Sequence, residues 1–553
     1  METGAAHGRA AWRHVAWALA LGLAAALLAS AVTAWRQTAA EGYWAAGYYR
    51  LLADALWKRF DGALPVAVPA SLTAGLLAAI LRRGRRRPRL GPALALLMVV
   101  GGVRGAGALD AWLASRGPNL VIISVDTLRA DRLGVYGYSL PTSPRLDRLA
   151  AEGVLVEDVY SQSPKTTPSH MTLLTSLYPC VHGVELWWND QPAHVLSPAV
   201  HTLAEVLKDA GYTTVAFTGG GQVDRSRGFD QGFDRYSHGQ ELEKTLDWLD
   251  AHRRRKFFLF FHTYMVHDPY VHPLRWVRLF DAEYHGGVLD AVERLLGEED
   301  GRGGPEVYSE NRHERFWASV RRDDPTDVRF VARLYDAGIR RMDETVLGPL
   351  LDRLDALGLT DNTLVVFTSD HGEAFGEHGH FGHDDLHGET LRVPLVLRFP
   401  GRLAAGRRVA GRARLLDVMP TVLDLLAVPA PPVVQGRSLV PRLTGQPEPT
   451  GGEAVVSEYD QRWAGRAYES VRRGRLSYIV EDAHEHLFDL VDDPGEANDL
   501  LDAKPTDAAA LRTVLASWGA ECRGLAGRYG PGDASVRPSA ERVRQLHALG
   551  YVE

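Results

Sequence analysis

One short stretch of the chain combines a hydroxyl residue, a proline and the expected start of a helix. It reads SPKTTPSH from Ser163 to His170, and the run MTLLTSL after it predicts a helix that begins near Ser169. Because the first N–H groups of a helix have no partner within the helix, its N-terminus favours an anion. Thr166 is therefore a candidate nucleophile, with a simple helix cap as the competing interpretation.

Two acidic residues and a histidine follow strand-like runs elsewhere in the chain. Asp126 follows NLVIISV, and Asp370 and His371 follow TLVVFTS in the stretch TLVVFTSDHGE. Two carboxylates, an imidazole and a hydroxyl can hold one divalent cation, which lowers the pKa of the hydroxyl and polarises an anionic ester. The predicted metal-binding set is therefore Asp126, Thr166, Asp370 and His371.

Alternating strand-like and helical patterns surround these residues. The strand-like runs are continuous and rich in apolar residues, as in a buried parallel sheet. Helical patterns separate them, including Thr202–Ala210 and a long one from about Asp327 to Leu357. This order predicts an α/β fold with a mostly parallel sheet, helices on both faces and ligands beyond the carboxyl ends of the strands. The expected strands are Asn119–Val125, Gly153–Tyr160, Thr213–Thr218, Phe257–His262, Thr363–Ser369 and Val393–Phe399.

Length and charge set limits on the class of protein. At 553 residues the chain is too long for one hydrophobic core, so more than one structural unit is expected. Residues 1–116 hold 14 Lys/Arg against 5 Asp/Glu, whereas residues 117–553 hold 48 against 64. The excess of acidic residues in residues 117–553 argues against a nucleic-acid partner. Cys180 and Cys522 can form at most one disulfide, and the sequence does not say whether they meet.

The basic N-terminal region contains three apolar runs. Val15–Trp35 is long enough to span a bilayer, although a signal peptide is the competing interpretation. Gly62–Leu81 is a second expected span, and the basic cluster Arg82–Arg89 after it should stay cytoplasmic. A third run, Gly91–Val103, is shorter. Three spans would place everything after residue 116 in the periplasm or outside the cell, and two would keep it inside; we expect three.

Several motifs together resemble the sulfatase family of the alkaline phosphatase superfamily, from Asn119 to about Leu500. NLVIISVDTLRADRLGVYG resembles the first metal-binding strand and turn of that family, and TTPSHMTLLTSLYP resembles its C-x-P-x-R signature region. FHTYMVHDPY is similar to a substrate-contacting stretch, and TSDHGEAFGEHGH to the second metal-binding turn. LLDVMPTVLDLLAV, GRSLVPRL and LFDLVDDPGEANDL are also typical of the family.

The resemblance implies a fold and a set of roles. The fold would be alkaline-phosphatase-like, with a small antiparallel sheet near the C-terminus, where alternating strands are also indicated by the sequence. Thr166 stands at the nucleophile position, His267 at that of an anion-contacting histidine, and His383 at that of a substrate-binding lysine. His383 is thus a candidate general acid.

The departures from the family pattern bear on the reaction. The family nucleophile is Cys or Ser oxidised to formylglycine, and threonine cannot form that aldehyde, so no formylglycine is expected and Thr166 would act as a metal-activated alkoxide. His170 replaces the arginine that closes the signature, Leu177 replaces a basic residue, and Thr127 replaces the second aspartate of an Asp-Asp pair. The remaining metal set resembles that of membrane-anchored phosphoglycerol and phosphoethanolamine transferases.

The other polar residues near these motifs have less definite roles. Lys165 either helps to bind the anion or forms an exposed salt bridge, and His170 either orients Thr166 or contacts the substrate. The remaining histidines of these motifs are expected to be structural or to support the site; they are His262, His378, His380 and His387.

The sequence therefore predicts a membrane-anchored, metal-dependent hydrolase or transferase acting on sulfate or phosphate esters. Residues 1–116 would form the membrane region, 117–430 the catalytic domain and 431–553 a C-terminal subdomain, with residues 241–333 contributing an insertion over the pocket. Calcium would follow the sulfatases, and manganese or zinc the threonine-using transferases. A phosphodiesterase and a non-catalytic sulfatase-like binding protein remain alternatives, and the oligomeric state is open.

Overall fold

The structure is a computed structural model, and it describes the chain from residue 117 onward with several gaps. The expected membrane spans fall in residues 1–116 and lie outside the described residues. Within the described part, no helix combines the length and the apolar character needed to cross a membrane. Residues from Gly117 onward belong to one compact unit. The described segments are 117–184, 193–239, 242–299, 312–446, 454–461, 466–529 and 535–539, with single residues at 543 and 546.

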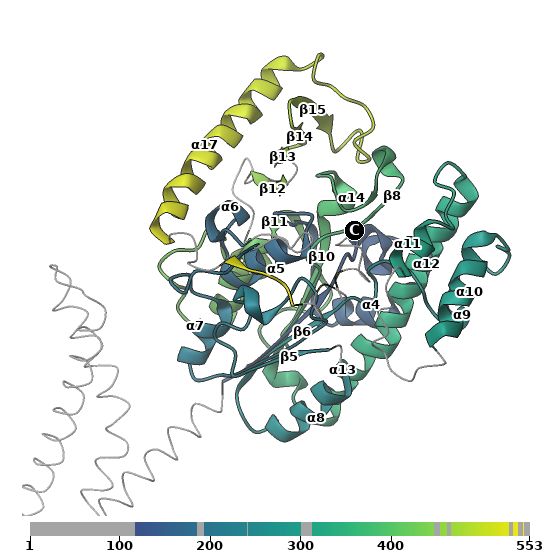
Figure 1. Ribbon diagram of the computed structural model, residues 1–553. Helices are drawn as coiled ribbons and strands as arrows, with labels where there is room; N and C mark the ends of the chain where they lie inside the picture. Colours follow the sequence, from purple (N-terminus) through teal and green to yellow (C-terminus); the bar gives the residue numbers. More distant parts are fainter. Residues whose placement is uncertain are drawn as a thin grey trace, which may run out of the picture. The chain divides into compact units, whose positions relative to one another are not determined.

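An eight-stranded sheet forms the centre of this unit, in the order β11-β2-β10-β7-β1-β6-β4-β5 (Figure 1). Only β10 runs antiparallel to its neighbours β7 and β2, so the predicted, mostly parallel sheet is confirmed. The strands are β1 (Asn119–Val125), β2 (Val154–Tyr160), β4 (Thr213–Thr218), β5 (Arg235–His238), β6 (Phe257–Thr263), β7 (Thr363–Thr368), β10 (Arg392–Arg398) and β11 (Arg407–Arg414).

Six of these strands match the expected ones to within one residue at each end, but β5 and β11 were not predicted. Their sequences, RYSH and RRVAGRAR, are polar and rich in arginine. Both lie at the edges of the sheet, where a strand needs less apolar surface and charged residues protect it from pairing with another chain. Hydrophobic runs therefore identified the inner strands and missed the two edges.

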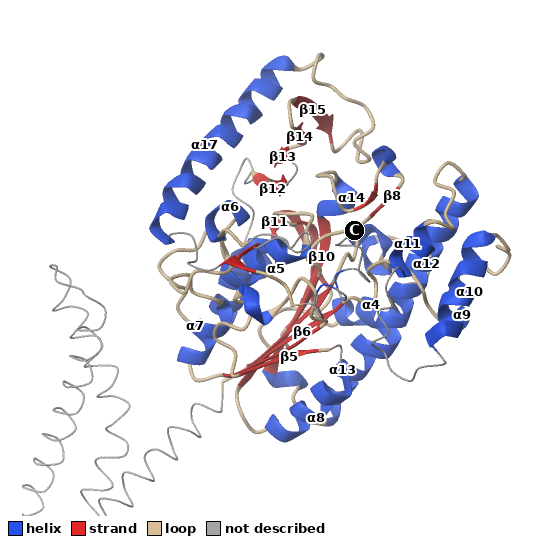
Figure 2. Cartoon of the chain, in the orientation of Figure 1, coloured by secondary structure: helices blue, strands red, loops and turns tan. Residues whose placement is uncertain are grey.

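Helices cover both faces of the sheet, as Figure 2 shows. Successive side chains of a strand point to opposite faces. In β1, Leu120 and Ile122 pack with one group of helices, and Val121 and Ile123 pack with the other. The first group includes α5 (Thr166–Thr175), α7 (Leu203–Asp209), α15 (Val418–Leu425) and α17 (Pro505–Tyr529). The second includes α4 (Pro144–Ala151), α8 (Leu242–His252), α12 (Pro325–Met342) and α13 (Gly348–Ala356).

The C-terminal part contains the expected small antiparallel sheet, in the order β12-β13-β14-β15. Its first strand is joined to the segment before α5, because Glu458 N–H donates to Gln162 O (2.9 Å) and the Ser457 hydroxyl to Ser161 O (2.6 Å). These contacts bring the small sheet to the edge of the candidate site. The strands are β12 (Val455–Gln461), β13 (Arg466–Arg473), β14 (Leu476–Glu481) and β15 (His484–Asp489).

A disulfide joins Cys180 to Cys522 across 342 residues of sequence. Cys180 lies in the short helix α6 (Pro179–His182), and Cys522 lies in α17, which the sequence analysis did not predict. The bond attaches the last long helix to the element that directly follows α5. It thus resolves the question of cysteine pairing that the sequence left open.

Candidate active site

The carboxyl ends of three neighbouring strands bring the predicted acidic residues together. β1 lies between β7 and β6, with Ser124 opposite Thr368 and Val125 opposite Thr263. Asp126 follows β1 directly, and Asp370 follows β7 after one further residue. The parallel register therefore places the two carboxylates at the same edge of the sheet, as expected for a ligand site in this class of fold.

Asp126, Asp370 and His371 each offer a ligand atom, and these atoms lie within 4.8 Å of one another. His371 Nε2 is 3.4 Å from Asp370 Oδ2 and 3.9 Å from Asp126 Oδ1. All three side chains are buried, and neither Asp126 Oδ1 nor Asp370 Oδ2 accepts a hydrogen bond from a described residue. Two buried carboxylate oxygens left in this way are costly unless a cation offsets them, so the group fits a divalent metal ion.

The protonation behaviour of this group agrees with that conclusion. Burial raises the pKa of Asp126 to about 7, and burial together with the nearby charge of Asp126 raises the pKa of Asp370 to about 7. Burial lowers the pKa of His371 well below its usual value. A neutral imidazole is the form that binds a metal ion.

The orientation of His371 is fixed by its second ring nitrogen. Nδ1–H donates to Gly372 O at 3.0 Å, so the lone pair of Nε2 faces the two carboxylates. Thr166 Oγ1 lies 3.3 Å from this Nε2. The hydroxyl of Thr166 thus lies with the three ligands. We name Asp126, Thr166, Asp370 and His371 the metal-ligand cluster.

Thr166 is the first residue of α5, and the helix begins three residues earlier than the sequence predicted. Pro168 stands in its first turn, where the missing N–H of proline costs no helical hydrogen bond. The expected start near Ser169 was therefore three residues too late, because the prediction rested on the apolar run MTLLTSL and a helix can include a proline in its first turn. Thr166 lies at the helix N-terminus, as expected, where an anion is favoured.

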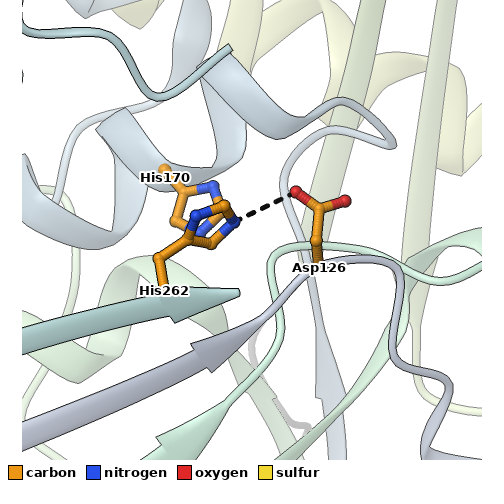
Figure 3. Close-up of side chains that lie close together, drawn as sticks. All are labelled: Asp126, His170 and His262. Carbon is orange, nitrogen blue, oxygen red and sulfur yellow. Dashed lines mark hydrogen bonds and ion pairs between the residues drawn. The ribbon is translucent and has the colours of Figure 1, made fainter. Parts of the chain in front are cut away.

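A second grouping, of Asp126 with His170 and His262, shares Asp126 with the first, and Figure 3 shows its three side chains. His262 accepts a hydrogen bond from Gly219 N–H at Nδ1 (3.3 Å), and its Nε2–H donates to Asp126 Oδ2 (3.2 Å). Both ring nitrogens are therefore engaged. His262 holds the carboxylate of Asp126 in place, as expected for a residue that supports the site.

His170 is also engaged at both nitrogens. Its Nδ1–H donates to Thr166 O (2.9 Å), one turn earlier in α5, and Nε2 accepts the hydroxyl of Ser124 (2.9 Å). The same Nδ1 lies 3.3 Å from Asp370 Oδ2. The side chain is fully buried, and burial lowers the pKa of His170 to about 4. Of the two roles considered for His170, the geometry supports the orientation of Thr166.

His267 approaches the metal-ligand cluster from the loop after β6. Its Nε2 is 4.0 Å from Asp126 Oδ1, and its Nδ1–H donates to Asp268 O at 2.7 Å. Burial lowers the pKa of His267, but the hydrogen bond and charge of Asp268 outweigh it and raise the pKa to about 10. Asp268 in turn accepts hydrogen bonds from His313 and Trp317 of α11 (Arg312–Trp317), at 2.9 and 2.8 Å. Part of the expected insertion therefore reaches the site.

Lys165, His383, Asp384 and Tyr459 form what we name the anion-side group. Lys165 Nζ donates to His383 Nδ1 (3.0 Å) and pairs with Asp384 Oδ1 (2.5 Å), which also accepts the hydroxyl of Tyr459 (2.9 Å). Because Nδ1 of His383 accepts, its Nε2 carries the proton, and the ring lies 4.5 Å from that of His371. Lys165 forms a salt bridge, as one alternative predicted, but the lysine is buried and braces His383.

The structure thus brings all of the predicted site residues into one connected group. The sequence analysis did not identify Asp268, Asp384, Tyr459 or Ser124 as partners. Asp268 directly follows His267 and Asp384 directly follows His383, and this adjacency was a signal that could have found those two. Tyr459 lies in a strand of the C-terminal sheet, so nothing local connects it to Lys165.

Comparison with known proteins agrees with the fold. The sulfatase family model matches residues 118–428, and the C-terminal model of N-sulphoglucosamine sulphohydrolase matches residues 376–516. An N-acetylglucosamine-6-O-sulfatase of Bacteroides thetaiotaomicron is 23% identical over 471 residues, covering 69% of this chain and 82% of that protein. An ulvan-active sulfatase of Formosa agariphila is 28% identical over 410 residues, covering 69% and 77%.

Solved structures show the same architecture. A protein in complex with its substrate, D-glucosamine-2-N,6-O-disulfate, superimposes with a TM-score of 0.60 at 20% identity, over 76% of this chain and 100% of that one. The phosphonate monoester hydrolase of Agrobacterium radiobacter superimposes with a TM-score of 0.56 at 23% identity, also over 76% and 100%. The chain therefore belongs to the sulfatase family of enzymes, with an alkaline-phosphatase-like α/β fold.

Proposed function

We propose that this protein is a metal-dependent hydrolase of sulfate or phosphate esters in which Thr166 replaces formylglycine as the nucleophile. The observation that carries the proposal is the position of the Thr166 hydroxyl. It lies at the N-terminus of α5 and 3.3 Å from His371 Nε2, inside the cluster of Asp126, Asp370 and His371. The hydroxyl also lies beside Asp126 and Asp370, each of which has one buried oxygen that accepts no hydrogen bond from a described residue, and a simple helix cap does not require such neighbours.

Asp126, Asp370, His371 and Thr166 would hold one divalent ion, which when bound lowers the pKa of the Thr166 hydroxyl and neutralises charge on the ester. The chain's own residues do the positioning. His170 fixes the backbone of Thr166 through its carbonyl, and His262 fixes Asp126. His267 presents Nε2 to the cluster and would contact the anionic group of the substrate.

His383 is the proposed donor to the leaving oxygen. Lys165 donates to its Nδ1, so Nε2 carries the ring proton, which we propose is donated to the substrate. Burial and the charge of Lys165 lower the pKa of His383 well below its usual value, so the ring is a neutral hydrogen-bond donor. A hydrogen bond from Nε2–H would stabilise the negative charge that develops on the leaving oxygen.

Threonine favours phosphorus esters over sulfate esters. A hydrated formylglycine expels sulfate by collapse to the aldehyde, whereas a threonine ester must be hydrolysed by attack at its phosphorus or sulfur. The threonine-using enzymes that this site resembles act on phosphorus. Sulfate esters are the second candidate substrate class, because this chain matches relatives named as sulfatases over 82% and 77% of the relatives' length.

We also propose that the protein is anchored by the apolar N-terminal runs, with the catalytic domain in the periplasm or outside the cell. The disulfide between Cys180 and Cys522 supports this location, because disulfides persist in oxidising compartments. A transferase that passes the group from Thr166 to another acceptor would use the same residues.

Metal reconstitution with a substrate panel tests the proposal. Metal-stripped protein, reloaded with calcium, manganese or zinc, would be assayed with aryl sulfate, phosphate monoester and phosphodiester substrates. We expect turnover that depends on the added metal and on Thr166, with phosphorus esters preferred. Metal-independent turnover, or full turnover by the Thr166→Ala variant, would contradict the mechanism.

A further inference from the structure

A loop between the catalytic turn and α14 carries a second cluster of potential metal ligands. It runs from residue 376 to residue 387 and includes β9 (Phe381–Gly382), which pairs with β8 (Ala374–Phe375). His378 lies near its start and His387 at its end, directly before α14 (Gly388–Leu391), which contains Glu389. β8 and α14 lie close together in the fold (Figure 1). From the sequence, both histidines were expected to be structural or to support the site.

Three side chains converge at this place. The rings of His378 and His387 are stacked, with centroids 3.7 Å apart and an angle of 11° between the planes. His378 Nε2 lies 3.5 Å from Glu389 Oε1, and ligand atoms of all three residues lie within 4.8 Å of one another. The group shares no residue with the metal-ligand cluster.

Several polar atoms here have no hydrogen-bond partner among the described residues. They are His387 Nδ1, Glu389 Oε1 and Asp385 Oδ2. His387 is 6% exposed and Asp385 is 1% exposed, so water does not readily satisfy them. His387 Nδ1 lies 3.4 Å from Asp385 Oδ1, but that oxygen already accepts His387 N–H (2.9 Å) and the Thr390 hydroxyl (3.1 Å).

The backbone of His378 adds a further sign of constraint. Its φ is +52°, in the left-handed region that residues other than glycine rarely adopt. Such strain persists only where surrounding structure imposes it, and it is concentrated at functional positions. The left-handed backbone of His378 accompanies a side chain that lies against Glu389, although His378 itself is exposed.

We propose that His378, His387 and Glu389 form a second metal site, with zinc as the expected ion and a carboxylate oxygen of Asp385 as the fourth ligand. Two imidazoles and a carboxylate suit zinc, whereas calcium requires a shell of oxygen ligands. Parallel rings do not aim their nitrogens at one point, so binding requires each histidine to turn about its Cβ–Cγ bond. The exposed edge of His378 provides the route of entry.

The site would brace the loop that carries His383 and Asp384. Its ligands lie at both ends of that loop, and the backbone at its C-terminal end is hydrogen-bonded to the catalytic turn. Glu373 N–H donates to Glu389 O (3.0 Å), and Gly372 N–H donates to Thr390 O (2.8 Å). A bound ion therefore ties the anion-side group to the turn that holds Asp370 and His371.

The test measures zinc binding in a full-length chain whose first site has been removed. The Asp126→Asn/Asp370→Asn variant keeps the second of the two proposed sites and loses the carboxylates of the first, so the result does not depend on the proposed reaction. After equilibration with zinc and removal of free metal, we expect about one ion per chain. Adding His387→Phe, which keeps a stacking ring but no nitrogen, should abolish binding.

A matched control separates ligand loss from disturbance of the loop. His380 is an exposed histidine of the same loop outside the cluster, so His380→Phe in the same background should retain the ion. Glu389→Gln, which keeps size and shape, should weaken binding at least tenfold and cancel the rise in melting temperature that zinc produces. Cobalt in place of zinc should show the visible bands of a four-coordinate site.

Two results would overturn the proposal. One is a failure of the Asp126→Asn/Asp370→Asn chain to bind zinc while its melting temperature in the absence of metal matches that of the wild type. The other is equal zinc retention in the His387→Phe and His380→Phe variants, which would assign the ion to another place.

Discussion

The metal-ligand cluster and the anion-side group are assembled in different ways. Asp126, Asp370 and His371 follow two adjacent strands whose register fixes their separation, and hydrogen bonds hold Asp126 and His371. Lys165, His383, Asp384 and Tyr459 come from the start of α5, a loop and the small sheet. The first group is set by the core of the fold and the second by contacts between separate elements.

This difference predicts a gradient of effects. Loss of a group in the metal-ligand cluster should stop the reaction, because no other part of the molecule can replace it. Loss of an anion-side residue should slow the reaction by a smaller factor the further that residue lies from the substrate. The expected loss of activity is therefore largest at Thr166 and smallest at Tyr459.

The largest effect is expected for Thr166→Ala. Removal of a nucleophile that acts as a unit with its activating groups lowers turnover by about 10³-fold or more. Metal content and melting temperature should change little, since three ligands remain. Turnover would be followed with the best ester of the panel and metal content by elemental analysis; a loss of less than tenfold would remove Thr166 from the proposed role.

His383→Ala should come next. A positioned donor to the leaving oxygen contributes about 10²-fold or more, so kcat should fall while the metal content stays unchanged. His380→Ala is the matched control, because His380 is an exposed histidine of the same loop. A substrate with a better leaving group should restore much of the loss. If both variants lose activity equally, His383 acts only through the loop.

His262→Ala tests the support behind the metal-ligand cluster. Residues that hydrogen-bond a metal ligand typically affect affinity by about 10- to 100-fold when removed. The apparent metal affinity should therefore fall, and saturating metal should restore most of the activity. His182, a buried neutral histidine bonded to Thr172, provides the control. Equal loss of affinity in His182→Ala would indicate a general loss of packing.

Tyr459→Phe should have the smallest effect. The change removes one hydrogen bond to the charged Asp384, worth about 1.5 kcal/mol, or roughly tenfold, which is the lower end of the range for charged partners because the Asp384 side chain is 57% exposed. We expect a rise in KM with little change in kcat, because the contact acts through Lys165 and His383. Tyr468→Phe, at the stacked neighbour in the same sheet, should leave both constants unchanged. A large kcat effect of Tyr459→Phe would place the tyrosine at the substrate.

The difference between the two groups also explains which site residues could be predicted from the sequence. Asp126, Asp370 and His371 were predictable because each follows a buried apolar run, and strand ends meet in a parallel sheet. The edge strand β11 was missed because it is polar and rich in arginine. The helix α17 was missed although its buried residues Leu511, Leu515 and Cys522 recur at helical spacing, a signal that could have identified it. The contact of Tyr459 with Asp384 could not be predicted, because it depends on how the small sheet docks against α5.

The turn at Thr127 shows a similar limit. Thr127 stands where the family has a second aspartate, and its φ is +57°. Its N–H donates to Asp370 Oδ1 at 3.2 Å, and its own hydroxyl donates to Asp126 O at 2.8 Å. The sequence predicted a lost ligand at this position. The structure adds that the backbone there helps to orient a remaining one.

The central claim is that the Thr166 oxygen attacks the ester, and trapping of the covalent intermediate tests it most directly. Metal-loaded protein would be quenched with acid during turnover of a phosphodiester or an aryl sulfate, digested and analysed by mass spectrometry. The account predicts one phosphoryl or sulfuryl group on Thr166, absent from the Thr166→Ala protein. A modified residue elsewhere, or an unmodified Thr166 under conditions in which a burst of product is released, would contradict it.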